Sequence, residues 1–520
     1  MIGLLIEMDE KILNNNIDSS RIFTKRQVEN LLTAAMGKTL LEVDSRQLFI
    51  LFAEKSKVTG IAGDIVEQSV LGCKPDNRQD IDILIDNIGY EIKTTGMVVP
   101  KDTNSPYYYE CKEPVSITAV SIQKIVNEEF ETSNFWHKLE HLLWVYYWYK
   151  SDVTVKLEGY KMFPLLNFQL FEFDDTDRLR LKHDWLLVRD FLISIHSDYS
   201  TSDERKLQYP RLSSELRGVL LVIDTAPKYP NPPRFRLKRS FATEVAATLF
   251  SKVRRRPLVK LSSPIMDYDD IDLKCQKLDQ MYVGKTFSDI AASLCISISS
   301  QKSQKQRFDA DSVMEEVAVK NFAELVVLKM FESNANSLND IEDFVKIGLI
   351  AKSLPLKANG MPKESMKLFT PNFEKWMKES TFENSFLHDY FMEHQFLFIV
   401  YQYDADGIRF KGFKRVVIPD TFIFNDVKKF WIDVRSLIQE KRLRVEKRFK
   451  KDGTPIMNKS GEQSEAPNFP KEKEYNVFMR GSTSESIEKR KTLVINDLRM
   501  IPQEIWLSKR ATLSLYQNSK

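Results

Sequence analysis

The 520-residue sequence has only four cysteines and six histidines. The cysteines are scattered along the chain, at Cys73, Cys111, Cys275 and Cys295. Because they form no Cys-x-x-Cys pair, they are typical of reduced thiols in a cytoplasmic protein and argue against a disulfide scaffold. His137 and His141 lie four residues apart without a third ligand nearby, which favours a packing or hydrogen-bonding role over a structural zinc site.

The sequence also lacks any apolar run long enough to span a membrane, since its longest candidate, residues 142–149, has the length of a strand. Its N-terminus has no basic region followed by an apolar stretch and a cleavage site, so we expect a cytoplasmic protein. The net charge of +3 is too small to identify a nucleic-acid partner by itself. A chain of this length exceeds one ordinary core, and we expect two or more domains.

The most informative segment is residues 80–93, which predicts two short strands joined by a turn at Asp86 and Asn87. Side chains two apart on a strand share a face. One face of this hairpin therefore presents acidic residues of the first strand beside Glu91 and Lys93 of the second.

This face has the residue types needed for phosphodiester hydrolysis. Asp82 or Asp80, together with Glu91, offers the hard oxygen ligands that Mg²⁺ prefers. Lys93 would position the attacking water as an ammonium group or deprotonate it as a neutral amine. A solvated strand face is the ordinary alternative, but these strands are otherwise apolar, and burying charge there without a purpose is costly. Asp82 opens the apolar run and is the preferred ligand.

Two residues outside the hairpin are further candidates. Glu67 lies on a predicted helix just before the hairpin, where it either joins the metal cluster or stays on an exposed helix face. Lys138 precedes the most apolar predicted strand, and is either a surface lysine or a second cation that contacts the scissile phosphate.

Hydrophobic periodicity predicts an α/β protein with a mixed sheet. The expected helices in the first half are 24–36, 60–71, 184–195 and 241–252. The expected strands are 81–85, 89–94, 115–119, 142–149, 156–160 and 234–238.

Basic stretches occur at residues 238–239, 254–256 and 441–451. Such runs are usually solvated, but in a nucleic-acid enzyme they supply salt-dependent phosphate contacts. The candidate DNA contacts are Arg211, Ser214 and Arg217, in a segment that we expect to be a loop, with Lys238 and Arg239.

The chain contains a diverged internal repeat. Three motifs recur in the same order at nearly the same spacing: residues 37–39 (GKT) at 284–286, residues 133–149 at 384–403, and residues 183–193 at 429–438. We therefore predict a first domain over 1–258, an acidic linker over 259–279 and a second domain over 280–520.

The second copy is expected to have lost the chemistry. Aligning "GYEIKTTGM" with "SLPLKANGM" places Lys357 opposite Lys93 and Pro355 opposite Glu91. Proline cannot ligate a metal, so the second copy is interpreted as a binding or regulatory domain.

Taken in order, these motifs resemble a known family over roughly residues 24–252. They are "AAMGKTLLEV", "GIAGDIVEQSVLG", an aspartate, "GYEIKTT", "NEEFETSNFWHK", "HDWLLVRDFLI" and "FRLKRSFATEV". The order is similar to that of MutH and of the Sau-3A type restriction endonucleases, which cut at GATC. The two-copy layout looks like the Sau-3A type.

The resemblance implies a PD-(D/E)xK restriction-endonuclease-like core that is present twice, the second time degenerate. The implied catalytic residues are Glu67, Asp82 (or Asp80), Glu91, Lys93 and Lys138. It further implies Mg²⁺ as cofactor, double-stranded DNA as substrate and a cognate DNA methyltransferase as system partner. The second domain would be an allosteric DNA-binding effector, in a protein that is a monomer in solution and dimerises on DNA. Two alternatives remain: a nicking endonuclease of mismatch repair, and a non-catalytic DNA-binding regulator with a nuclease fold.

Overall fold

The computed structural model describes residues 18–53, 60–75, 81–102, 105–225, 233–249, 254–296, 312–405 and 407–518. The chain divides into two compact units: unit 1 is residues 1–99 and 108–253, and unit 2 is residues 100–107 and 254–520. Both units mix helices and β-sheet, in agreement with the predicted α/β class. The predicted linker 259–279 is not a bare connection, because most of it belongs to helix α12 (Tyr268–Tyr282) of unit 2.

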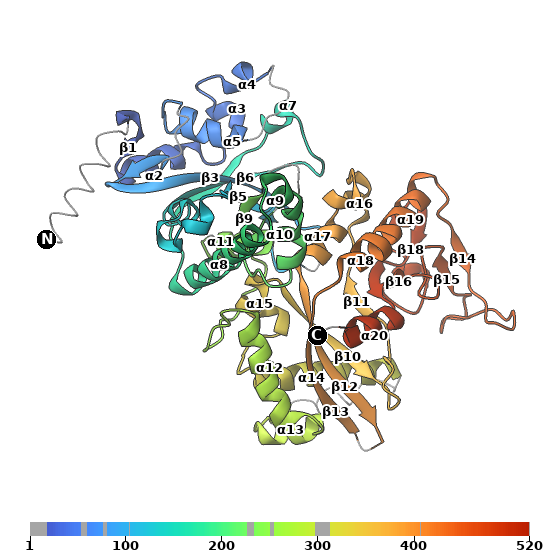
Figure 1. Cartoon of the computed structure of the whole chain (residues 1–520). Coiled ribbons are helices and arrows are strands. Elements are labelled where there is room, and N and C mark those ends of the chain that lie inside the picture. The colour runs from blue at the N-terminus through green and yellow to red at the C-terminus, as the bar shows by residue number, and fades with distance from the viewer. Residues whose placement is uncertain are drawn as a thin grey trace. The chain divides into compact units, whose positions relative to one another are not determined.

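Unit 1 is built on a mixed sheet (Figure 1). The strands of that sheet are β1 (Ile22–Phe23), β2 (Ile83–Ile85), β3 (Ile88–Val98), β4 (Glu110–Cys111), β6 (Leu142–Trp148) and β7 (Leu165–Phe171). A separate three-stranded sheet contains β5 (Val115–Ala119), β8 (Ile223–Asp224) and β9 (Arg234–Leu237). The helices of unit 1 are α2 (Lys25–Ala35), α3 (Leu40–Val43), α4 (Leu48–Leu51), α5 (Ile61–Asp64), α6 (Asn134–His137), α7 (Leu157–Tyr160), α8 (Asp175–Asp198), α9 (Ser202–Gln208), α10 (Pro210–Leu216) and α11 (Arg239–Leu249). Single turns are η1 (Ser19–Arg21), the π-helical η2 (Ile65–Val70), η3 (Ile125–Asn127) and η4 (Phe130–Thr132).

The sheet order β1–β2–β3–β6–β7 places the predicted hairpin beside the most apolar strand. β2 and β3 are antiparallel, β3 and β6 are parallel, and β6 and β7 are antiparallel. Asp86 and Asn87 connect β2 to β3 with φ values of 48° and 66°, which is the left-handed geometry of a two-residue hairpin turn. The hairpin and its turn are therefore confirmed.

Helix α2 and the helix over residues 60–71 pack against one face of this sheet. α2 begins at a capping box between Thr24 and Gln27 and buries Val28 and Leu32 against the sheet, as its periodicity predicts. The predicted helix 60–71 is confirmed in position, but α5 continues as the π-helix η2.

One strand prediction was wrong. Residues 156–160 form helix α7, and the next strand is β7. The alternation of apolar residues around Leu157 suggested a strand, but Leu157 and Tyr160 lie three apart and both pack against the same core, which is helical spacing.

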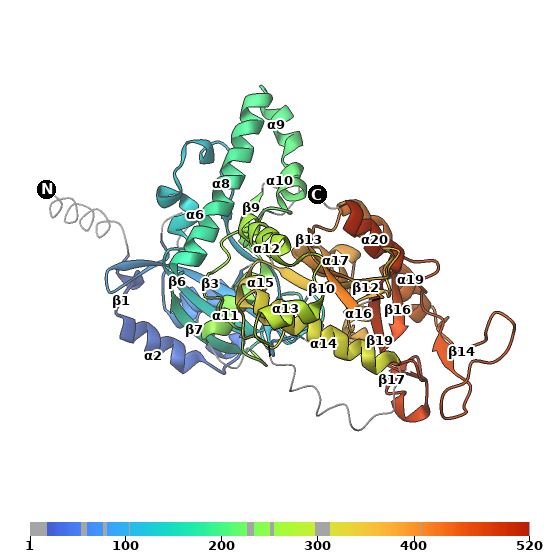
Figure 2. The same ribbon diagram turned by 90° about the horizontal axis from the view of Figure 1, so that it is seen from below.

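Helices α8, α9 and α10 project from the sheet of unit 1 (Figure 2). The predicted helix 184–195 is confirmed as part of α8. The segment that contains Arg211 and Ser214 was expected to be a loop, but it forms α10, which begins at Pro210 in a favoured first-turn position.

Unit 2 has its own strands: β10 (Leu349–Leu356), β11 (Met366–Phe369), β12 (Gln395–Asp404), β13 (Gly407–Val416), β14 (Val445–Lys447), β15 (Glu465–Pro467), β16 (Val477–Gly481), β17 (Leu493–Ile495), β18 (Leu498–Met500) and β19 (Gln503–Leu507). Besides α12, its helices are α13 (Phe287–Ser293), α14 (Ser312–Met330), α15 (Glu342–Lys346), α16 (Phe373–Lys378), α17 (Phe386–Glu393), α18 (Asp420–Phe422), α19 (Lys428–Gln439) and α20 (Lys509–Asn518). Single turns are η6 (Leu338–Asp340), η7 (Phe382–Asn384), the π-helical η8 (Ile423–Val427) and η9 (Glu488–Arg490).

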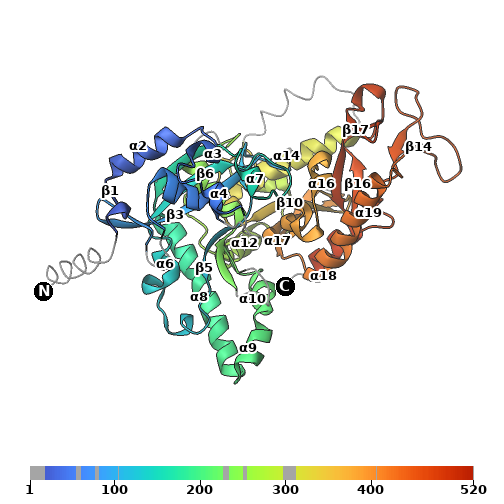
Figure 3. The same cartoon turned by 90° about the horizontal axis from the view of Figure 1, so that it is seen from above.

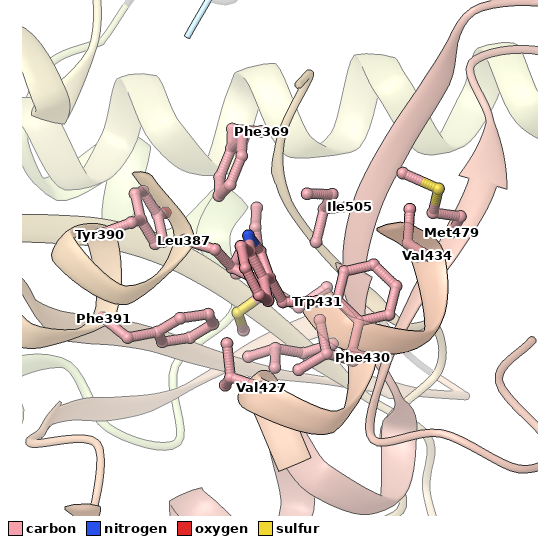
Figure 4. Packing of buried hydrophobic residues seen from close by; sticks show 14 of the residues in the cluster. Phe369, Leu387, Tyr390, Phe391, Val427, Phe430, Trp431, Val434, Met479 and Ile505 are labelled. Carbon is pink, nitrogen blue, oxygen red and sulfur yellow. The ribbon is translucent and has the colours of Figure 1, made fainter. Parts of the chain in front are cut away.

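Two three-stranded sheets organise unit 2, with orders β10–β12–β13 and β11–β19–β16. β10 and β12 are parallel, and β12 and β13 are antiparallel. Figure 4 shows the aromatic core of this unit, in which Trp431 and Phe430 of α19 meet Phe391 and Leu387 of α17. In the part of the chain that the structure describes, no helix is long and apolar enough to cross a bilayer.

Candidate active site

Glu91, at the start of the pairing between β3 and β6, is the centre of a charged cluster in unit 1. Its side chain is buried, with 4% of the residue exposed. Lys93 Nζ donates to Glu91 Oε1 at 2.6 Å, and Lys138 Nζ donates to both carboxylate oxygens at 3.0 Å. Lys93 is two residues along the same strand and thus on the same face. Two partly buried ammonium groups therefore converge on one buried carboxylate.

Lys138 reaches this point because of the short helix α6, which ends at His137. Ser133 caps α6 by accepting a hydrogen bond from the Trp136 N–H. The chain then enters β6, which runs parallel to β3 and pairs Leu142 with Glu91. The strand register thus places Lys138, which precedes β6, beside the Glu91 end of β3.

Asp82 is the other carboxylate of the hairpin. Its backbone N–H donates to the Tyr90 carbonyl at 3.1 Å, and its Oδ2 accepts from the Ile92 N–H at 2.7 Å. Burial, and then repulsion by the Glu91 charge, raise the pKa of Asp82 to about 6. Because Tyr90 and Ile92 flank Glu91 in β3, these two hydrogen bonds place Asp82 opposite Glu91. Asp80, the alternative ligand, lies outside the described residues.

Glu67, on η2, is held by a residue that sequence reasoning missed. Arg21 NH2 donates to Glu67 Oε1 at 2.5 Å and to the Lys74 carbonyl at 2.6 Å, while its NH1 donates to the Asp82 carbonyl at 2.7 Å. The Arg21 side chain is only 4% exposed. No motif singles out Arg21; only its buried position between Glu67 and the hairpin reveals it.

The residue types and their charges fit a divalent cation held by Asp82 and Glu91. The Glu67 and Glu91 charges both raise the pKa of Asp82, and a cation would relieve that repulsion. Among the described residues, no three or more His, Cys, Asp or Glu side chains gather closely enough to hold a metal ion without other ligands. Mg²⁺ commonly uses one or two carboxylates and completes its shell with waters and substrate phosphates, so a two-carboxylate site is compatible with it.

Comparison with known proteins agrees with this geometry. The model of the family described as "MutH: DNA mismatch repair enzyme MutH" matches residues 71–184. That range contains Asp82, Glu91, Lys93 and Lys138. The chain is also 24% identical over 432 residues to the type II restriction enzyme Sau3AI of Staphylococcus aureus, a match that covers 80% of this chain and 80% of the relative.

The chain is thus similar to MutH in part of unit 1 and to a Sau3A-type restriction endonuclease over most of its length. The match to Sau3AI is longer than unit 1 and therefore extends into unit 2. The resemblance predicted from the sequence is confirmed.

The first group of predicted DNA contacts lies on or next to helix α10. Arg211, on α10, forms an ion pair with Glu215, its Nε lying 2.5 Å from Oε1, and the Ser214 hydroxyl lies near backbone carbonyls of its own helix. Arg217 lies just past the end of α10. Whether this helix contacts DNA stays a prediction.

Lys238 and Arg239, at the junction of β9 and α11, are buried, with 7% and 8% of each residue exposed. Lys238 Nζ donates to the Leu220 carbonyl at 2.5 Å. Their burial argues against both residues as phosphate contacts. Nothing in the sequence indicated that Lys238 and Arg239 are buried, since β9 is too short for its alternation to show which residues are covered.

The raised pKa of Asp82 predicts how stability depends on pH. A carboxyl group that binds its proton more tightly in the folded state stabilises that state below its unfolded pKa, and this contribution is lost as the pH rises through about 6. Asp82→Asn keeps an oxygen acceptor for the Ile92 N–H but carries no charge. We expect it to raise the unfolding free energy at about pH 8 by roughly 2–3 kcal/mol without metal, and to have little effect at about pH 4.

Thermal unfolding of the metal-free protein at the two pH values measures this. Asp86→Asn, the same change at the exposed turn of the hairpin, is the matched control and should leave the melting temperature unchanged. If Asp82→Asn lowered stability equally at both pH values, the carboxylate would be structural and the repulsion argument wrong.

Proposed function

We propose that the chain is a type II restriction endonuclease that cleaves double-stranded DNA at 5′-GATC-3′ with Mg²⁺. The observation that carries the proposal is the convergence of Lys93 and Lys138 on Glu91, with Asp82 beside it. The match to the MutH family model supports endonuclease chemistry, and the similarity to Sau3AI supports a restriction enzyme. We further propose that unit 1 has the PD-(D/E)xK core.

Each residue of the cluster has a role in this proposal. Asp82 and Glu91 hold the cation, which when bound lowers the pKa of a water and stabilises charge on the phosphate. Lys93 orients the attacking water or accepts its proton. Lys138 binds an oxygen of the scissile phosphate, for which its point charge is suited. Glu67, held by Arg21, supports the position of Asp82.

We also propose that unit 2 is a diverged copy of unit 1. Matching turns support this: Gly37 and Gly284 follow helices α2 and α12 with φ values of 79° and 86°. The Gly37 N–H donates to the Leu165 carbonyl at 2.8 Å, and the Gly284 N–H donates to the Phe410 carbonyl at 2.9 Å. These acceptors lie on β7 and β13, the third strands of the two matching β3–β6–β7 and β10–β12–β13 arrangements.

A register irregularity supports the same match. The β6–β7 pairing shifts at Tyr146/Tyr147, and the β12–β13 pairing shifts at Val400/Tyr401. These are aligned positions of the repeat found in the sequence. A shared bulge at a shared position favours common descent over two independent solutions, because bulges are kept within families.

The strand register points to different counterparts from those expected from the sequence. Lys93 pairs across β3–β6 with Trp144, while Lys352 pairs across β10–β12 with Phe398, which aligns with Trp144. Under the proposed duplication, Lys352 therefore takes the place of Lys93. Lys357 lies beyond the end of β10. The alignment of Lys357 with Lys93 therefore differs from the strand register.

By the same register, Ile350 takes the place of Glu91, rather than Pro355. Isoleucine cannot hold a cation, so we propose that unit 2 does not cut. In this reading it binds a second copy of the site and stimulates unit 1, in a protein that is monomeric in solution and dimerises on DNA. A methyltransferase of the same specificity would protect the host DNA.

Digestion of unmethylated plasmid tests the proposal. We expect Mg²⁺-dependent double-strand cuts whose sequenced ends all lie at GATC, lost with a chelator and in Glu91→Ala. Asp86→Asn, which changes an acidic residue of the same hairpin away from the cluster, should cut normally. Ends at another sequence would overturn the specificity alone, nicked circles would favour a mismatch-repair activity, and binding without cleavage would favour a regulator.

A further inference from the structure

A basic ribbon extends from unit 2 between β14 and β15. We define it as residues 441–467. Of these residues, eight are Lys or Arg and four are Asp or Glu. Figure 3 shows it reaching away from the sheets of its own unit.

The ribbon is built from regular hydrogen bonds, although its composition is typical of a solvated loop. Three segments of the ribbon lie side by side, around residues 448, 456 and 464. Turns at Gly453 and Gly461, which both have positive φ, connect them. The Ile456 N–H donates to the Arg448 carbonyl at 3.0 Å, the Ser464 N–H donates to the Ile456 carbonyl at 2.7 Å, and the Arg448 N–H donates to the Ser464 carbonyl at 2.8 Å. The positive charges are therefore presented on a defined scaffold.

Several of these charges have no counter-charge in the described part of the chain. Near the base of the ribbon, Arg442 and Arg444 pair with Glu440 and Glu446. Farther out, Lys447, Lys450 and Lys451 are exposed, and no described carboxylate forms an ion pair with them. Uncompensated cations on a fixed scaffold attract a polyanion at close range.

Apolar side chains accompany these lysines. Phe449 is 56% exposed and Met457 is 53% exposed. Phe449 forms a β-bridge with Pro455, just before the turn at Gly453. DNA-bending proteins use this combination, in which Phe, Met or Pro wedges enter a groove beside Lys and Arg contacts to phosphate. A surface that binds phosphates by charge alone would need no exposed aromatic residue.

We infer that the ribbon is a duplex-DNA-binding arm, with Lys447, Lys450 and Lys451 on phosphates and Phe449 against a base step in the groove. The inference deepens the proposed function, on which it rests, by assigning where unit 2 holds DNA.

The test measures binding of the full chain to a fluorescent duplex with one GATC, without metal, over a range of salt concentrations. The variant Lys447→Ala/Lys450→Ala/Lys451→Ala should reduce the slope of log affinity against log salt by about 2–3, since each phosphate contact contributes about 0.9. The control Lys277→Ala/Lys285→Ala/Lys411→Ala removes the same charge from exposed positions on α12, beside it and on β13, and should keep the slope. Phe449→Ala should weaken binding about tenfold at an unchanged slope.

Four results bear on the inference. A reduced slope confined to the ribbon variant supports it. Equal slopes for the ribbon and control variants, in a protein that still binds and cuts DNA, overturn the arm and leave the proposed function intact. Failure of the unaltered protein to bind any duplex overturns the proposed function and the arm together. Polyglutamate serves as a second probe, in place of the duplex. If the ribbon variant bound DNA normally but no longer bound polyglutamate, the ribbon would be assigned to an acidic protein surface instead.

Discussion

Lys93→Met is expected to reduce DNA cleavage at least about 10³-fold while leaving DNA binding within a few-fold of normal. A positioned proton acceptor or donor contributes on the order of 10²–10⁴ to a rate. Lys93 also lies 2.6 Å from the buried Glu91 carboxylate, so its loss disturbs the cluster electrostatically as well. Methionine keeps the length and apolar stem of lysine and removes only the ammonium group.

Lys352→Met is the matched control, because under the proposed duplication Lys352 corresponds to Lys93. Its Nζ donates to the carbonyls of Lys367 and Leu368 at 2.9 and 3.1 Å, and burial lowers its pKa to about 8. No carboxylate takes the position of Glu91 there, so we expect cleavage at the normal rate under conditions where the variant is folded.

Both variants are compared by their cleavage rates on one plasmid and by their binding to a duplex without metal. Equal losses in both variants would mean that both units carry the chemistry and would overturn the proposal of an inactive second unit. Normal cleavage by Lys93→Met would remove Lys93 from the mechanism and leave Lys138 as the candidate.

The part of the site that the sequence predicts is the part set by local geometry. Asp82, Glu91 and Lys93 lie on one hairpin, where a period of two and a turn at Asp86-Asn87 decide which side chains share a face. The same reasoning located β3, β5 and β6. It failed at α7, because Leu157 fits both a short strand and one helical turn.

Contacts between distant segments were beyond that reasoning. Arg21 meets the Asp82 carbonyl sixty-one residues away, and no spacing rule connects them. The counterparts proposed for unit 2 depend on strand register, which favours Lys352 where the sequence match favoured Lys357. Burial of Lys238 was equally hidden, because its covering elements come from other parts of the chain.

Arg21→Met is expected to destabilise unit 1 by roughly 3 kcal/mol, because it leaves three acceptors without their buried donor. Those acceptors are Glu67 Oε1 and the carbonyls of Asp82 and Lys74, all within 2.7 Å of the guanidinium. The melting temperature of unit 1 should fall by about 10 °C. Arg46→Met, the same substitution at an exposed site of unit 1, should change it by less than about 2 °C.

A second measurement separates positioning from simple stability. Since Arg21 fixes the backbone at Asp82 and orients Glu67, we expect Mg²⁺ to raise the melting temperature of the unaltered protein and of Arg46→Met but not that of Arg21→Met. Adding Glu67→Gln to Arg21→Met should restore part of the stability, because the carboxylate left without its cation is then neutral. It should not restore cleavage, since the carbonyl of Asp82 still lacks its donor. Full Mg²⁺ stabilisation in Arg21→Met would show that the hairpin alone holds Asp82 in place, and that Arg21 contributes only to folding.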